Sequence, residues 1–318
     1  MERLKAIWSM IHLKVFRPFL RSIQDDEVKF RLWTATKITV IPLFSVLMMF
    51  FLLFLFLQLN VGFFAMFESV RISPLQELFY EYVLKNSLDR FPLFLSLFIL
   101  QFLIGMYIAR LLLRPFVAIG TYCRNVTEQK EVSYDPDFFT DLKLLTRFSE
   151  YFFNWLENAL KDQKLEPVKI PKKFTQIHKP VFEVQFFIQY SFFIFCSSLI
   201  FGVISYSVML GIQENIISFA NETLSLNMEM NRFLLRQSLL LEDMLLGVVI
   251  FHFLLNLILS IHLYYRVSGP AFGMFATMRS FIKGNYKARV HLIGYYYVRK
   301  QCRFFNKYLD FIERKCVK

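Results

Sequence analysis

Polar residues inside long apolar runs are the side chains of this sequence that most need a chemical role. His252, Asn256 and His262 lie in the uncharged run 244–265, where an imidazole or a carboxamide would find little water to hydrogen-bond. Such groups either pair with polar groups on neighbouring helices or conduct protons along a row. His252 and His262 are ten residues apart and so face different sides of a helix. Both interpretations stay open, and interhelical hydrogen bonding needs fewer assumptions.

The other residue types that catalyse reactions show no spacing that would bring them together. None of the five histidines stands in an HxxxH or HExxH pattern, and no two cysteines form a CxxC pair. The sequence has no glycine-rich phosphate loop. We therefore expect a protein that is not an enzyme and that uses no cofactor and no metal. We expect the cysteines to be unpaired thiols; they are Cys123, Cys196, Cys302 and Cys316.

The composition indicates a membrane protein. Of the 318 residues, 56% are hydrophobic and 18% aromatic, whereas soluble domains are about 45–50% apolar. The excess is concentrated in four runs, each of at least the ~20 residues that cross ~30 Å of hydrocarbon. We predict an all-α integral membrane protein with four transmembrane helices in two hairpins. The predicted spans are 38–59, 91–113, 184–210 and 244–265.

The basic residues predict the orientation and the first partner. Eight Lys or Arg residues lie in 1–37, eleven in 114–183 and twelve in 266–318, against three in 60–90 and two in 211–243. Because positive charge gathers on the cytoplasmic side, we expect both termini and the middle segment in the cytoplasm. The net charge of +12 flanks the apolar runs. It therefore favours anionic lipid headgroups as the partner, and not nucleic acid.

The segments between the spans carry weaker signals. Residues 1–22 form a basic amphipathic pattern that predicts a helix lying either on the membrane surface or against the protein. We expect a short interfacial helix within 68–90 and an amphipathic helix pair within 211–243. The basic linker 161–183 contains prolines, so we expect an extended segment that is held near anionic lipid or simply solvated.

Two stretches of the chain resemble each other, and they are called here the first copy (114–160) and the second copy (266–318). Each follows an apolar run, opens with a proline (Pro115 or Pro270) and ends in an amphipathic helix with Phe-Phe-Asn. In the second copy we expect Pro270 to start a helix and Gly284 to end it. Apolar residues then recur at steps of four and three, as in coiled packing. These residues are Val298, Cys302, Phe305, Leu309 and Ile312.

The second copy resembles a HAMP domain, the linker module of bacterial membrane sensors. The matching positions are Pro270, Gly284, Val290 in the connector, Phe305 and Asn306. It departs from the family at Tyr296-Tyr297, where HAMP domains usually carry an acidic pair. The first copy keeps Pro115, Phe153 and Asn154, and has Gln129 in the position of the glycine.

The resemblance implies a parallel four-helix bundle, which HAMP domains usually build from two chains. A chain with two copies could complete that bundle alone as a pseudo-dimer, or it could form a homo-oligomer. We expect the bacterial inner membrane as the location. The expected domains are 1–30 (basic amphipathic segment), 31–113 (first transmembrane hairpin), 114–160 (first HAMP-like module), 161–183 (linker), 184–265 (second hairpin) and 266–318 (second module).

Three functions fit these features. The first is a non-enzymatic signal relay or adaptor that passes helix movements to an unidentified membrane or cytoplasmic protein. The second is a structural scaffold subunit of a larger membrane complex, such as a motility or secretion machine. The third, an ion-conducting or transport protein, is weaker because the second and fourth spans hold few ionisable residues. No kinase or cyclase segment follows the second copy, so we expect the modules themselves to be the interaction surface.

Overall fold

The structure is a computed structural model that describes residues 25–68, 72–130, 132–134, 142–223 and 228–316. The amphipathic segment expected at 1–22 lies outside the described residues. The ordered elements are helical, and within the described ranges the chain has no strand. They are α3 (Asp26–Glu68), α4 (Ile72–Thr127), α5 (Lys143–Asp162), α6 (Lys172–Thr175), α7 (Val184–Thr223), α8 (Met228–Ile282), the 3-10 turn η2 (Tyr296–Val298) and α9 (Arg299–Cys316).

Four of these helices are long and apolar enough to cross a membrane: α3, α4, α7 and α8. Each contains one of the four predicted spans, so the prediction of an all-helical chain with four candidate membrane helices is confirmed at this level. Asp25 starts α3, since its carboxylate accepts the backbone N–H of Glu27 at 2.9 Å. This is the usual role of an aspartate before the first helical residue.

The helices are longer than the sequence suggested, and two expectations about their ends were wrong. α4 has 56 residues, about 84 Å at ~1.5 Å per residue, and it includes the segment expected to be a separate interfacial helix. α8 continues through Pro270, which was expected to start a new helix. Proline inside a helix removes one hydrogen bond and costs about 3 kcal/mol unless the freed carbonyl finds another partner. Such a partner exists for Pro270 and is described below.

The described chain divides into two compact units, and the division falls within the long helices. The bundle unit comprises 35–105 and 192–259. The module unit comprises the start of α3 up to Thr34, then 106–191 and 260–318. Each unit therefore combines residues from both halves of the chain.

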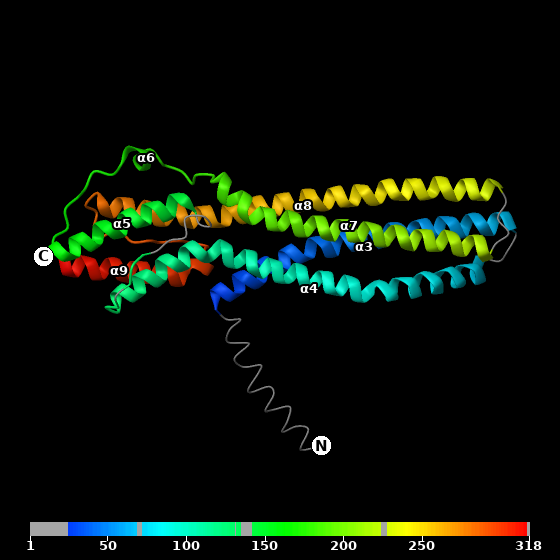
Figure 1. Ribbon diagram of the computed structural model, residues 1–318, viewed down its shortest axis with the longest axis horizontal. Helices are drawn as coiled ribbons and strands as arrows, with labels where there is room; N and C mark the ends of the chain where they lie inside the picture. Colours follow the sequence, from blue (N-terminus) through cyan, green and yellow to red (C-terminus); the bar gives the residue numbers. More distant parts are fainter. Residues whose placement is uncertain (1–24, 69–71, 131, 135–141, 224–227, 317–318) are drawn as a thin grey trace, which may run out of the picture. The chain divides into compact units, whose positions relative to one another are not determined.

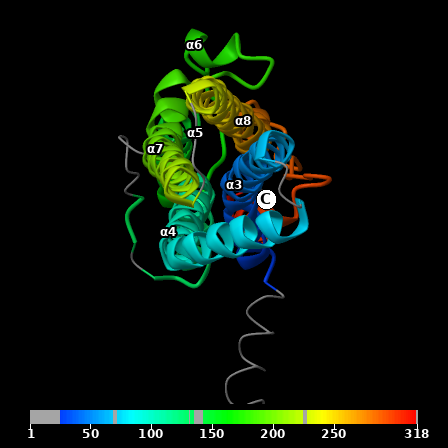
Figure 2. The ribbon, with the colours of Figure 1, turned by 90° about the vertical axis from the view of Figure 1, so that its right-hand side faces the viewer.

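The bundle unit is a ring of four helices in the order α3, α4, α7 and α8, seen along the helices in Figure 2. Contacts between neighbours fix this order. A Cβ placed on Gly105 of α4 would lie 2.6 Å from the Ala35 Cα of α3, so these two backbones touch. Phe98 of α4 packs on Phe201 of α7, with ring centroids 5.4 Å apart. The core continues beyond the predicted spans, through buried residues that include Val61, Phe64, Phe79, Ile216 and Leu234.

The module unit holds four helices that run in the same direction: the ends of α4 and α8, with α5 and α9. Figure 1 shows α5 and α9 side by side. Residues later in α5 contact residues later in α8 and α9. This order requires the helix axes to be parallel. In order along α5 they are Phe148 with Phe275, Phe152 with Phe281, Phe153 with Tyr308 and Ala159 with Cys316.

The first helix of each copy ends in the same way. Gln129 has φ 59° and Gly284 has φ 98°, both in the left-handed region. In each case the residue's own N–H bonds the carbonyl three residues back, and the next N–H bonds the carbonyl five residues before it. The four bonds are Gln129 to Val126, Lys130 to Asn125, Gly284 to Phe281 and Asn285 to Ser280. This is the Schellman motif, so both copies share one helix ending although only the second has glycine there.

A glycine at the first copy's helix end should stabilise the chain. Gln129→Gly removes a Cβ from a left-handed residue and should raise the free energy of unfolding by about 1 kcal/mol. Gly284→Ala should lower it by about as much, because the new Cβ would also lie 3.3 Å from Pro167. Denaturant unfolding in mild detergent measures both. Gly211→Ala is the control: this helical glycine has no neighbour within 4 Å, and alanine should be neutral or stabilising there. Destabilisation by Gln129→Gly would contradict the strain argument.

Candidate functional site

The connector of the second copy is fastened to α9 by two side chains. The Asn306 carboxamide accepts the N–H of Val290 at 2.8 Å and donates to its carbonyl at 3.0 Å. The Val290 side chain is buried. Arg289 forms ion pairs with Asp310 (2.7 Å) and with Glu313. The Asn306 carboxamide satisfies both backbone groups of Val290, as a neighbouring strand would in a sheet. Val290 therefore cannot shift along α9 without losing both bonds.

The carbonyl that Pro270 leaves unpaired is satisfied from the turn before α9. A proline has no N–H, so the carbonyl four residues earlier, on Arg266, loses its helical partner. The Tyr297 hydroxyl donates to that carbonyl at 2.6 Å. Tyr297 is buried, and burial raises the pKa of its hydroxyl, which therefore stays protonated and able to donate. The ring packs on Phe30 of α3, with centroids 4.3 Å apart.

Tyr297 thus joins three parts of the module unit: the end of α8, the start of α9 and the start of α3. It stands where the sequence departs from the HAMP pattern, so the departure coincides with a contact between the connector region and the preceding helix. Sequence reasoning missed this contact. The Arg266 carbonyl, which Pro270 leaves without a helical partner, was the one signal in the sequence that could have suggested a nearby donor.

The predicted seam residues of the second copy form part of the core. Val298, Cys302, Phe305, Leu309 and Ile312 are all buried. Burial raises the pKa of the Cys302 thiol to about 12 and that of Cys123 well above its usual value, so neither is a reactive thiolate at neutral pH. All four cysteines are free.

The first copy has a similar core but a different surface. Pro115 and Phe153 are buried, whereas Asn154, which corresponds to Asn306, is exposed. The Tyr122 hydroxyl of α4 donates to the Glu157 carboxylate of α5 at 2.8 Å. Burial, followed by the hydrogen bond to Glu157 and the charge of that carboxylate, raises the pKa of Tyr122. The proline and Phe-Asn positions therefore lie in comparable places. The pair of hydrogen bonds from the asparagine side chain to the connector backbone, called here the Val290 clamp, is described only for the second copy.

The linker between the copies packs on the module unit through its apolar residues. Phe174 in α6 is buried against Phe148 of α5, with ring centroids 5.0 Å apart. Arg279 of α8 donates to the carbonyls of Phe174 and Ile177, at 3.3 and 2.6 Å. The alternative of a merely solvated linker was therefore wrong for this part, because burial of Phe174 and the Arg279 bonds hold it to the helices. The expected proximity to anionic lipid stays a prediction.

In the bundle unit, two of the three predicted polar residues come together. His252 Nδ1 lies 3.0 Å from the Ser45 hydroxyl of α3, and its other ring nitrogen lies 3.3 Å from the Asn256 amide. Asn256 also donates to the Ser198 hydroxyl of α7 at 3.1 Å. His262 is exposed on α8 and belongs to the module unit. The network links three helices of the ring, which is the interhelical hydrogen bonding considered for these residues.

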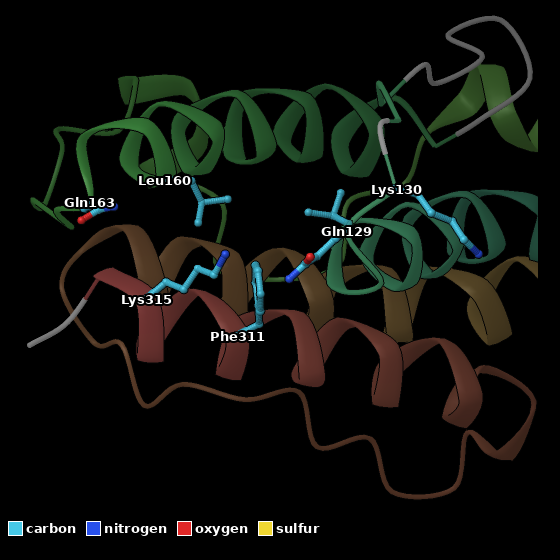
Figure 3. A pocket seen from close by; sticks show the side chains of 7 residues that line it. Gln129, Lys130, Leu160, Gln163, Phe311 and Lys315 are labelled. Carbon is cyan, nitrogen blue, oxygen red and sulfur yellow. The ribbon is translucent and has the colours of Figure 1, made fainter.

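A cavity of about 510 Å³ lies where α4, α5 and α9 end. Leu160 of α5 and Phe311 of α9 point toward one another across it (Figure 3). Its lysines already have partners: Lys130 pairs with Glu128 at 2.6 Å, and the Lys315 ammonium lies 4.6 Å from the centre of the Phe311 ring. The remaining lining residues are Val126, Gln129 and Gln163. The cavity is an open recess of mixed chemistry, and its lining identifies no ligand.

The chemistry of the described residues offers no metal centre, because they contain no group of three or more His, Cys, Asp or Glu side chains that could hold an ion. No protein-family model, curated protein or solved structure matches this chain. The module unit, with its four parallel helices and its clamped connector, is therefore the candidate functional site on geometry alone.

Tyr297→Phe removes the donor to the Arg266 carbonyl and should lower the free energy of unfolding by about 1 kcal/mol. Pro270→Ala restores an N–H that can pair with the same carbonyl, so in that background Tyr297→Phe should cost about 0.5 kcal/mol or less. Denaturant unfolding of the four proteins of this double-mutant cycle measures the coupling. Tyr296→Phe, next in the chain, should change little. An additive cycle would show that the two residues do not share the carbonyl.

A second cycle tests the network in the bundle unit. Ser45→Ala and His252→Leu should show a coupling of about 0.6 kcal/mol, the mean for hydrogen bonds between membrane helices. The control pairs Ser45→Ala with His262→Leu, for which no coupling is expected. Unfolding by SDS titration from mixed micelles gives both values. Equal couplings in the two cycles would contradict the assignment.

Proposed function

We propose that this chain is a non-enzymatic membrane signal relay in which two HAMP-like modules pair within one chain. One observation carries the proposal: two helices from each copy run parallel and share one aromatic core. Their first helices are the continuations of α4 and α8, which extend unbroken from candidate membrane spans. The module therefore has the helix count and direction that the resemblance implies, built by one chain.

The mechanism we propose is mechanical. A continuous helix transmits a rotation or a shift along its axis with little loss, so movement of α4 or α8 in the membrane would reach the module core. There, α5 and α9 would repack against them and change the surface offered to a separate partner. We propose, from the basic segments, that the module lies in the cytoplasm beneath the bacterial inner membrane and its anionic headgroups.

The scaffold is the second candidate. The Val290 clamp and the Tyr297 bond favour it, because they fasten the second copy in one arrangement. A scaffold would use the same module as a docking surface without movement. Conduction remains the weaker third candidate: the polar groups described around His252 bond one another, and paired groups of this kind stabilise helix contacts without requiring a path.

Pairing within one chain is tested by disulfide formation. The Cys316 thiol lies 3.5 Å from the Ala159 carbonyl, so Ala159→Cys should form a bond with Cys316 on oxidation. We expect a linked peptide pair in a protein that stays monomeric on a non-reducing gel. Asn158→Cys, exposed on the other face of α5, is the control and should not react with Cys316. A bond that forms only between chains would reject the pseudo-dimer and favour a homo-oligomer.

Relay and scaffold differ in whether the module moves. Spin labels at exposed positions 154 and 307, one in each copy, report the distance between α5 and α9. Nanodiscs of lipids with short and long acyl chains impose different tilts on membrane helices. A relay should shift this distance by about 1–2 Å between the two bilayers. An unchanged distance distribution would favour the scaffold.

A further inference from the structure

The two hairpins begin with acidic residues in equivalent places. Asp25 precedes α3, and its backbone carbonyl accepts the N–H of Lys29 at 2.9 Å. Glu183 precedes α7, and its carbonyl accepts the N–H of Phe187 at 3.0 Å. Each residue therefore stands at the cap position of the first helix of its hairpin.

Each acidic group also reaches the second helix of the opposite copy. The Glu183 carboxylate accepts the backbone N–H groups of Lys143 (2.6 Å) and Leu144 (3.0 Å), the first two residues of α5. The residue before α5 is Leu142, whose side chain cannot accept a hydrogen bond, so Glu183 supplies the cap from a distant part of the chain. A carboxylate at a helix N-terminus also interacts favourably with the helix dipole.

In the other hairpin, the acidic residues at the start of α3 form ion pairs with the first residues of α9. Asp26 lies 3.7 Å from Arg299, and Asp25 lies 3.8 Å from Lys300. When the two copies are aligned on Phe-Phe-Asn, Arg147 takes the position of Arg299. The charge of Arg147 acts on Glu183, so a cation at the same position faces the acid in both copies.

The two contacts differ in strength. Glu183 is half-buried, and its N–H bonds the Tyr264 hydroxyl at 2.6 Å, which itself donates to the Val181 carbonyl at 2.8 Å. The Asp26–Arg299 pair has side chains 34% and 59% exposed. Exposed pairs at such distances contribute about 0–1 kcal/mol and weaken with salt. The α7–α5 contact is therefore firm and the α3–α9 contact loose.

We propose that Glu183 is a positioning residue that couples the start of the third membrane helix to the second helix of the first module, so that displacement of α7 moves α5. The proposal rests on the proposed function for its signalling role, while the contact itself stands independently of that role. The α3–α9 ion pairs form the weaker counterpart. Input through α7 thus reaches α5 directly, in addition to the route along the continuous helices α4 and α8.

The charge state of Glu183 makes the stability of the folded chain depend on pH with a definite sign. Burial raises the pKa of the carboxyl, against the opposing effect of the Leu144 and Lys143 N–H bonds and of the Lys143 and Arg147 charges. A raised pKa in the folded state means that the protonated form is favoured there. The contribution to stability is complete below the unfolded pKa of about 4.3 and is lost as pH rises through the folded pKa.

Hydrogen exchange of the full chain in nanodiscs tests the contact. Glu183→Ala removes both acceptors and should speed exchange at the first turn of α5 about tenfold, as expected for the loss of about 1.4 kcal/mol. Glu183→Gln keeps one uncharged acceptor and should lie between the wild type and Glu183→Ala. Glu166→Gln, an exposed acid of the linker paired with Lys164, is the matched control. Unchanged exchange in Glu183→Ala would overturn the proposal.

Two further readouts separate coupling from simple capping. The free energy of unfolding of the wild type should fall relative to that of Glu183→Gln as pH rises above about 4.3, because burial favours the protonated carboxyl. The bilayer-dependent change in the 154–307 distance should shrink in Glu183→Ala and persist in Glu166→Gln. A change that persists in Glu183→Ala would reject the coupling. The Ala159→Cys disulfide reports the pseudo-dimer separately, so either proposal can fail alone.

Discussion

The packing of Phe152 at the centre of the module unit is the interaction on which the rest of this arrangement depends. This fully buried ring contacts Phe281 of α8 and Phe305 of α9, with ring centroids 6.1 and 6.0 Å apart. Phe281 and Phe305 belong to the second copy and Phe152 to the first. An aromatic side chain buries about 150–250 Å² and prefers tilted or edge contacts, as here. The two copies therefore share a single hydrophobic core, and neither buries its apolar face without the other.

A shared core constrains where each helix can end. In each copy two parallel helices pack side by side, so the first must end where the connector can return to the start of the second. Both first helices stop with a Schellman motif fourteen residues after their proline, although one uses glycine and the other Gln129. A left-handed glutamine costs about 1 kcal/mol more than a left-handed glycine. The ending therefore persists against local preference, which indicates that packing of the helices, and not the sequence of the turn, decides where they stop.

The features that depended on local patterns were predictable from the sequence. Long apolar runs predicted the four candidate membrane helices, and the step of four and three predicted the buried face of α9. Helix ends were less predictable: Pro270 is ordinarily a sign of a helix start, but its cost is reduced when a hydroxyl from Tyr297 reaches the freed carbonyl. That bond joins residues 31 apart in the chain. The Glu183 cap joins residues 40 and 39 apart. No periodicity encodes such contacts, because they depend on the helices already being packed.

The described contacts that hold the second helices differ between the two copies, and this difference bears on the choice between a relay and a scaffold. The second copy is fastened within itself, through Asn306 on Val290 and Tyr297 on Arg266. The first copy leaves Asn154 exposed and takes the cap of α5 from Glu183, outside its own helices. The cap stabilises α5 in a static scaffold as well as in a relay. In a relay it would have a second effect, because a carboxylate that spans both elements makes the position of α5 depend on that of α7. The asymmetry therefore favours α5 as the helix that moves and the second copy as the frame against which it moves.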